Sequence, residues 1–209
     1  MEQLARHQCL IYAGAPSHLL PALATKMRQM LDANYRCLYL NSPPMVAGIS
    51  SYLAAHGVDV ALEKAKTRIL LSSDQPHLSR GDFDIEEMIC KLEAAAVQAV
   101  TDGYKGLWAS GDMMWEFGTE RNLPKLGEYE RRLEELFDRQ PTLLGICQYH
   151  CDLLPPEILR WALLTHRALF VDASVSRINP HYNKSGTPGN PLNPQLDAII
   201  AAIRGCGTA

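Results

Sequence analysis

The sequence predicts an α/β fold, a three-layer αβα sandwich whose central sheet is mainly parallel. Short apolar segments alternate with longer ones in which apolar residues recur every three or four positions, as strands and helices do in βαβ units. In addition, polar residues follow most of the short apolar segments. Parallel strands joined by right-handed connections place their carboxyl ends along one edge, so these polar residues are expected to converge there.

The predicted elements follow one another in a regular order along the chain. Strands are predicted where short apolar segments are bounded by turn-forming residues, at 7–12, 37–40, 69–71, 107–109, 143–149 and 168–171. Helices are predicted where apolar positions have helical spacing or where a capping residue or proline begins the segment, at 18–34, 43–55, 84–102, 123–139, from Pro155-Pro156, and at 195–204.

Four local patterns refine this assignment. Ser17 and Asp84 are the expected N-caps of the first and third helices. Within 128–139, acidic and basic residues at spacings of three and four predict a solvated outer helix face. The strand at 107–109 is expected to end where polar residues begin. Residues 175–194 are rich in Pro, Gly and Asn and are predicted to be irregular.

The composition is that of an ordinary globular protein. Of the 209 residues, 47% are hydrophobic and 21% charged, and no apolar run approaches the roughly 20 residues of a membrane-spanning helix. We expect a single domain over 1–209, with a core at about 7–182 and then an irregular segment and a closing helix. The beginning of the chain lacks a secretory signal, which predicts a cytoplasmic protein whose six cysteines are mostly thiols. The net charge of −3 gives no basic surface for direct binding of nucleic acid.

The polar residues at the expected carboxyl edge form the predicted ligand-binding site. Its centre is segment 106–118, GLWASGDMMWEFG, in which Trp115 offers an apolar face and Asp112 and Glu116 offer carboxylates to orient a small molecule. Packing for Trp108 and helix capping for Asp112 are the alternative roles. The full predicted set is Ser17, His18, Ser42, Asp74, His77, Ser110, Asp112, Trp115, Glu116, Gln148 and His150.

Cys147, His150 and Cys151 have side chains suited to zinc binding or to nucleophilic chemistry. With His7 or Cys9 from a neighbouring strand, they reach the four ligands of a structural zinc site. Alternation along a strand, however, points Cys147 and His150 to opposite faces, so we expect no metal site. A Cys151 nucleophile beside His150 is the enzyme alternative, although neighbours in sequence seldom have the required geometry.

Several segments are specific when taken together, namely HQCLIYAG, YRCLYLNSPPMVAG, LLSSDQPHLSRGDFD, DGYKGLWASGDMMWEFG, EYERRLEELF, GICQYHCDLLPPE and SRINPHY. In this order they resemble the MEDS family, the methanogen/methylotroph sensory domain of the regulator DcmR, which is itself similar to RecA/KaiC-like ATPases. The resemblance extends from His7 to about Tyr182. It implies a RecA/KaiC-like fold and a sensory, ligand-binding role in prokaryotic signalling and transcription, with small hydrocarbon derivatives as the suggested ligands.

The chain departs from the ATPase pattern at the phosphate loop. Such a loop needs glycines, a Lys and a Ser or Thr, but this chain has AGAPSHLL, with Ser17 and His18 in that place and no Lys before Lys26. ATP hydrolysis is therefore not expected, and no cofactor is assigned. Anion or nucleotide binding at the helix N-terminus near Ser17 is left open.

We therefore expect a non-catalytic sensor that binds a small molecule and signals to a partner in trans, either a regulatory protein or a kinase. A homo-oligomer is left open, and neither nucleic acid nor a membrane is expected to bind directly. The alternatives are a degenerate nucleotide-binding protein of the RecA/KaiC type and a Cys/His-dependent enzyme.

Overall fold

The computed structural model describes residues 6–72, 84–114, 123–183 and 194–206. In this part of the chain, a seven-stranded sheet has the order β3-β2-β4-β5-β1-β6-β7. The strands are β1 (His7–Tyr12), β2 (Arg36–Leu40), β3 (Ile69–Ser72), β4 (Leu107–Asp112), β5 (Leu143–His150), β6 (Ala168–Phe170) and β7 (Ser176–Ile178). All paired strands are parallel except β6 and β7, which confirms the mainly parallel sheet.

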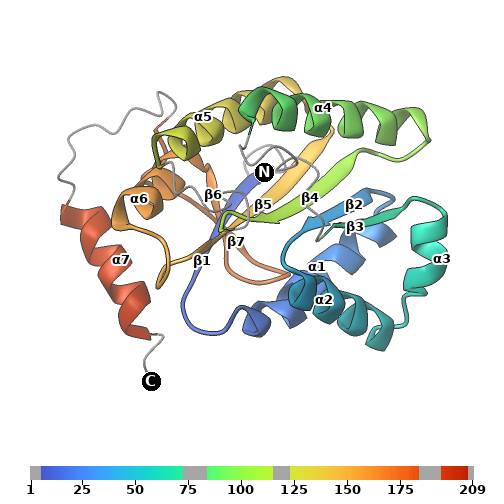
Figure 1. The fold of residues 1–209 in the computed structure, drawn as a ribbon, viewed down its shortest axis with the longest axis horizontal. Coiled ribbons are helices and arrows are strands. Elements are labelled where there is room, and N and C mark those ends of the chain that lie inside the picture. Colours follow the sequence, from blue (N-terminus) through green and yellow to red (C-terminus); the bar gives the residue numbers. More distant parts are fainter. Residues whose placement is uncertain (1–5, 73–83, 115–122, 184–193, 207–209) are drawn as a thin grey trace.

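Helices cover both faces of the sheet, which confirms the predicted α/β fold and gives three layers (Figure 1). They are α1 (Leu20–Asp32), α2 (Pro43–Ala55), α3 (Val60–Ala65), α4 (Ile85–Thr101), α5 (Leu123–Arg139), α6 (Pro156–Thr165) and α7 (Pro194–Cys206), with a 3₁₀ turn at Pro16–Leu19. Among the described residues, no helix combines the length and apolar character that crossing a membrane requires.

Alternation along the strands divides the core between the two faces. On the face covered by α1 and α2, buried Trp108 and Ile146 pack among residues such as Leu23 and Ile49. On the face covered by α4, α5 and α6, Cys147 packs with residues of the adjacent strands, such as Cys9 and Leu107, against the apolar sides of those helices. Residues adjacent on one strand therefore face different environments, because side chains alternate with a period of two.

Several predicted helix starts are confirmed by their local contacts. Asp84 is the N-cap of α4, where its carboxylate accepts a hydrogen bond from the Glu87 N–H at 2.9 Å. Pro43 and Pro156 occupy the first positions of α2 and α6, where the missing N–H of proline costs no helical hydrogen bond. The described cysteine side chains are thiols rather than disulfides.

Ser17 is not the cap of the first helix, so that prediction was wrong. Pro16 begins a 3₁₀ turn in which the His18 N–H donates to the Ala15 carbonyl, and α1 begins only at Leu20. Neither helix start has a side-chain cap. The turn satisfies its own backbone and fixes the entry to α1, and Ser17 is left exposed.

The prediction was also wrong at the end of β4 and within the segment 175–194. β4 continues through Ser110 to Asp112, because β2 and β5 pair with it on both sides and the buried polar side chains find partners. Within 175–194, which was predicted to be irregular, Ser176–Ile178 pairs with β6 as an edge strand. Its three side chains are exposed, so it has no apolar pattern to predict it. The short helix α3 was not predicted either.

The predicted solvated face of 128–139 is wrong at two of its acids. Glu130 and Glu134 are 0% and 8% exposed and lie on the side of α5 that faces the sheet. Arg131, by contrast, pairs with Glu128 and Glu135 on the exposed side, as the charge spacing predicts. Spacing alone could not separate the two sets, because acids on both sides of this helix are three or four residues from a base.

Candidate functional site

Six polar side chains meet at the edge where β1, β2, β4 and β5 end, and we refer to them as the carboxyl-edge cluster. They are Tyr12, Asn41, Ser110, Asp112, Gln148 and His150, and all are buried. The sheet register brings them together, because Tyr12 is the neighbour of His150 across β1 and β5, and Asp112 is the neighbour of Gln148 across β4 and β5. The predicted convergence of polar residues at this edge is therefore observed for these positions.

Gln148 is the centre of one half of the cluster. Its side-chain N–H donates to the Ser110 hydroxyl oxygen at 2.8 Å, and that hydroxyl donates to the Ile146 carbonyl at 3.0 Å. Asn41 donates to the Gln148 side-chain carbonyl at 3.5 Å and to the Tyr39 hydroxyl oxygen at 3.1 Å. These contacts hold a fully buried amide in one orientation.

Asp112 is the centre of the other half. One carboxylate oxygen accepts the Met114 N–H at 2.9 Å, and the other accepts the Tyr12 hydroxyl at 3.3 Å. Burial raises the pKa of Asp112, while these hydrogen bonds and the nearby His150 oppose the rise. Burial likewise raises the pKa of Tyr12, and the Asp112 carboxylate adds to that effect. The site thus contains a carboxyl group whose charge is costly, beside a neutral phenol.

The residues after β5 argue against an activated cysteine. Burial and the Asp152 carboxylate raise the pKa of Cys151 to about 11, whereas a nucleophilic thiol needs a lowered pKa. His150 instead packs its ring 4.8 Å from that of Tyr12 and accepts the Asp152 N–H at 3.3 Å. Asp152 also accepts the Gly14 N–H at 2.8 Å, so the loop after β1 already binds a carboxylate of the same chain.

The predicted site residues fall into three groups. Ser110, Asp112, Gln148 and His150 belong to the carboxyl-edge cluster, and Ser42 follows Asn41, to whose side chain its N–H donates at 2.8 Å. Ser17 and His18 are exposed on the 3₁₀ turn and are not among these contacts. The predicted residues outside the described part of the chain are Asp74, His77, Trp115 and Glu116.

The sequence-based set missed Tyr12 and Asn41. Each is a polar residue at the end of a predicted strand, and that position is the signal that could have identified both. Trp108 is 1% exposed and packs in the core, in agreement with its packing alternative.

Two hollows lie near the sheet. A cavity of about 30 Å³ lies on the face of β4 and β5 that α4 and α5 cover, with Leu92, Tyr129, Leu133 and Cys147 among its mostly apolar lining residues. A larger cleft of about 500 Å³ lies at the opposite, amino edge, where Lys26, Lys105 and Trp108 are among its lining residues. The small cavity has room for about two water-sized groups. The larger cleft has the volume of an ordinary ligand site.

A family model described as the methanogen/methylotroph, DcmR sensory domain matches residues 6–167. The chain belongs to the MEDS family. The matched region contains all six residues of the carboxyl-edge cluster and every strand that supplies them. A search of curated proteins found no match. The family assignment makes this MEDS chain a sensory domain.

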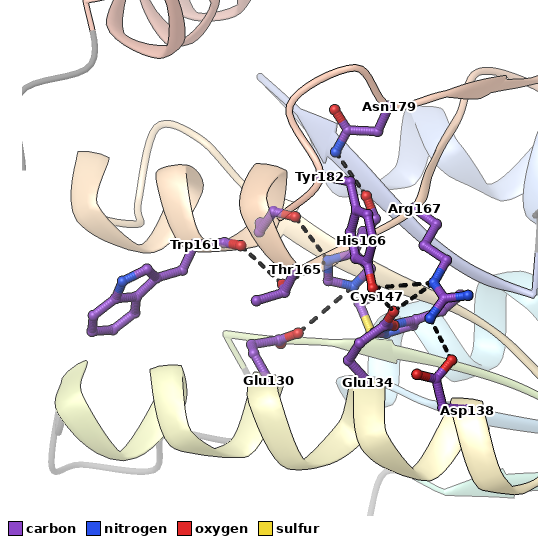
Figure 2. Close-up of polar contacts among 12 residues, drawn as sticks. Glu130, Glu134, Asp138, Cys147, Trp161, Thr165, His166, Arg167, Asn179 and Tyr182 are labelled. Carbon is purple, nitrogen blue, oxygen red and sulfur yellow. Dashed lines mark hydrogen bonds and ion pairs between the residues drawn. The ribbon is translucent and has the colours of Figure 1, made fainter. Parts of the chain in front are cut away.

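A second group of buried polar residues lies on the other face of β5 of the MEDS domain, between α5 and α6 (Figure 2). We refer to its four inner members, His7, Glu130, Cys147 and His166, as the histidine–cysteine cluster. Burial raises the pKa of Glu130 to about 8 and lowers that of His166 well below its ordinary value. The sequence analysis did not single out Glu130 or His166, because no local motif links a helix acid to a histidine 36 residues later.

An outer layer of charged and hydroxyl groups supports the histidine–cysteine cluster. Glu134 accepts hydrogen bonds at 2.8 Å from both Arg167 and the Tyr182 hydroxyl, and Arg167 also pairs with Asp138 (Figure 2). Burial raises the pKa of Glu134, but hydrogen bonds and charges from His7, Tyr182 and Arg167 lower it overall. Glu134 is therefore a carboxylate held in place by several donors.

Proposed function

We propose that this MEDS domain is a non-catalytic sensor that binds a small molecule at the carboxyl edge of its sheet. Occupancy is passed in trans to a partner, either a regulatory protein or a kinase. The carboxyl-edge cluster is the observation that supports this proposal, because it joins oriented polar groups from four strand ends at the edge where α/β sheets bind ligands.

The chemistry of the edge suits a small, partly apolar ligand. Gln148 and Asp112 are oriented by hydrogen bonds and offer polar groups to a ligand. The sequence directly after β4 contains Trp115, whose side chain offers an apolar face. This combination is compatible with the small hydrocarbon derivatives that the family resemblance suggests.

Two observations weigh against the alternatives. The high pKa of Cys151 disfavours a Cys/His-dependent enzyme. The Asp152 carboxylate at the Gly14 N–H occupies part of the loop where a degenerate nucleotide-binding protein would need donors for phosphate, and it adds repulsion toward an anion. Calorimetry with ATP and magnesium tests this directly. We expect no heat of binding and no turnover, and magnesium-dependent turnover lost in Asp112→Asn would favour the nucleotide alternative.

Ligand binding at the carboxyl edge is tested by mass spectrometry and by titration. Native mass spectrometry of the purified chain would reveal a retained small molecule, and methanol, methylamine and dichloromethane provide a first panel for titration by NMR. Asp112→Asn should weaken binding of the compound found by about tenfold, since it removes one hydrogen-bond acceptor of a ligand-facing carboxyl group.

Variants at the opposite edge serve as the matched control. Lys105→Ala changes an exposed residue of the amino-edge cleft and should leave the affinity unchanged. Loss of binding in Lys105→Ala or Lys26→Ala, with unchanged affinity in Asp112→Asn, would show that the ligand binds in the amino-edge cleft and would contradict the proposal.

A further inference from the structure

Four potential metal ligands from separate elements meet in the interior of the domain. His7 lies on β1, Glu130 on α5, Cys147 on β5, and His166 directly after α6. All four are buried, and one ligand atom from each lies within 4.8 Å of every other. The side chains of Glu130, Cys147 and His166 converge from different sides in Figure 2. They form a set of two imidazoles, a thiol and a carboxylate.

Both histidines are oriented as metal ligands usually are. The Nδ1 atom of His7 lies 2.7 Å from a Glu134 carboxylate oxygen, and Nδ1 of His166 lies 2.8 Å from the Ala162 carbonyl. A ring nitrogen facing such an acceptor carries the hydrogen, so the Nε2 atom of each neutral ring has a free lone pair. Those two Nε2 atoms face Cys147 and Glu130, at 3.5 and 3.7 Å. A carboxylate or carbonyl behind a metal-bound histidine is the usual supporting arrangement.

Glu130 has carboxyl oxygens that its protein surroundings do not fully satisfy. Among the described residues, neither oxygen has a hydrogen-bond partner of normal geometry, although the nearby Tyr149 hydroxyl lowers the pKa of Glu130, and His166 Nε2 lacks such a partner too. Both residues are 0% exposed. Buried polar atoms without partners are rare in folded proteins because each one costs free energy. Two such atoms that face each other across 3.7 Å indicate room for a shared partner.

We propose that the histidine–cysteine cluster binds a zinc ion. Nitrogen, sulfur and carboxylate oxygen are the ligands of zinc, and four protein ligands without an open position are typical of a structural site. With zinc–ligand bonds of about 2.0 to 2.3 Å, the ligand atoms of a tetrahedron lie about 3.3 to 3.8 Å apart. The contacts of 3.5 and 3.7 Å already have this spacing, and the longest separation, at most 4.8 Å, needs to close by about 1 Å.

Charge balance supports the same ion. A divalent cation with one thiolate and one carboxylate has no net charge, which suits a site without solvent contact. On binding, the Cys147 thiol and the Glu130 carboxyl group each lose a proton to solvent, and sulfur–zinc and oxygen–zinc bonds replace the S–H and O–H bonds. The expectation of no metal considered only Cys147, His150 and Cys151 with His7 or Cys9. His150 is not part of the cluster, but Glu130 and His166 supply the two further ligands.

Bound zinc would fasten α5 and the end of α6 to β1 and β5, so the proposed role is structural. It is independent of ligand binding at the carboxyl edge, because the two groups lie on opposite faces of β5. The two proposals can therefore fail separately, and Asp112→Asn should retain its zinc.

Metal analysis and cobalt substitution test the zinc site. The full chain, purified without chelator, should contain stoichiometric zinc by plasma mass spectrometry. After removal of zinc, Co²⁺ should produce the thiolate-to-cobalt charge-transfer band and the strong visible bands of a tetrahedral site. Folded wild-type chain that contains no zinc and shows no such bands with Co²⁺ would overturn the proposal.

Cys147→Ser should abolish the charge-transfer band, because serine supplies no thiolate. Cys37→Ser is the matched control: its thiol is also buried but lies on the α1–α2 face, so the band should remain. A band that persists in Cys147→Ser, or that disappears only in Cys37→Ser, would contradict the assignment.

A second variant keeps the test decisive where Cys147→Ser does not fold. Glu134→Gln leaves all four ligands in place and changes the acceptor behind His7, together with its contacts to Arg167 and Tyr182. Loss of such a supporting group typically weakens metal affinity about 10–100-fold. Competition with a chelator should show this loss, while the cobalt bands remain tetrahedral. Affinity equal to that of the wild type would count against zinc binding through His7.

Discussion

Cys147 and Gln148 are neighbours on β5, yet they belong to polar groups with opposite properties. In the carboxyl-edge cluster, polar side chains satisfy one another, and no described member has a buried nitrogen or oxygen without a hydrogen bond. In the histidine–cysteine cluster, Glu130 and His166 have buried atoms without one. The side chains of the first group satisfy one another and need no added group for stability. The second has buried polar atoms that a bound zinc ion would satisfy, as buried polar groups require partners.

The largest difference between the two clusters is expected in the stability of a variant at His166. We expect His166→Ala to cost on the order of 3–4 kcal/mol of unfolding free energy, because it empties a fully buried site and removes the ring nitrogen that lies 3.7 Å from Glu130. Urea unfolding followed by circular dichroism measures this. His18→Ala, at an exposed position, should stay within about 0.5 kcal/mol of the wild type. Equal effects of the two substitutions would show that the histidine–cysteine cluster contributes little to stability.

At the other cluster, the largest effect should be on binding rather than on stability. Trp115 lies outside the described residues, and in the sequence it directly follows the described segment 84–114, which contains Asp112. Trp115→Ala should remove an apolar contact and weaken ligand affinity by roughly thirtyfold, about 2 kcal/mol, with a smaller change in the melting curve. Calorimetric titration together with a melting curve tests this. A collapsed melting transition, or intact affinity in a folded variant, would exclude Trp115 from the ligand site.

The outer layer of the histidine–cysteine cluster allows a finer test. Tyr182→Phe removes one hydrogen bond at 2.8 Å to the Glu134 carboxylate and should cost about 1–2 kcal/mol of unfolding free energy. Tyr52→Phe, at an exposed position on α2, is the control and should have almost no effect. If chemical denaturation gives the same midpoint for both variants, Tyr182 does not support Glu134 in solution.

The smallest expected effect is a pH dependence at Asp112. Burial raises its folded-state pKa above the ordinary value of 3.8, so its contribution to stability is greatest in acid and is lost as the pH rises through the raised value. Asp112→Asn cannot ionise and keeps an acceptor for the Met114 N–H. Its stability relative to the wild type should therefore increase between pH ~4 and ~8, measured by urea unfolding at several pH values. A relative stability that falls with pH would show that the carboxylate is favoured in the folded chain.

Much of this architecture follows from local sequence pattern. The cap at Asp84 and the prolines that begin α2 and α6 were predicted because they act through their nearest neighbours in the chain. The convergence of Ser110, Asp112, Gln148 and His150 followed from the parallel arrangement of the strands. Polar residues within β4 were misread as its end, because the pairing partners that satisfy them come from other parts of the sequence.

The sequence by itself determined that Cys147 and Gln148 face opposite sides, because a strand has a period of two. Only the tertiary structure decided what each of them meets. His7 reaches Cys147 across 140 positions because β1 lies next to β5, and Glu130 joins them because one side of α5 packs on that pair. A residue's face is set by backbone geometry over a few bonds. Its neighbours depend on how distant apolar surfaces are buried together, which no local window of sequence contains.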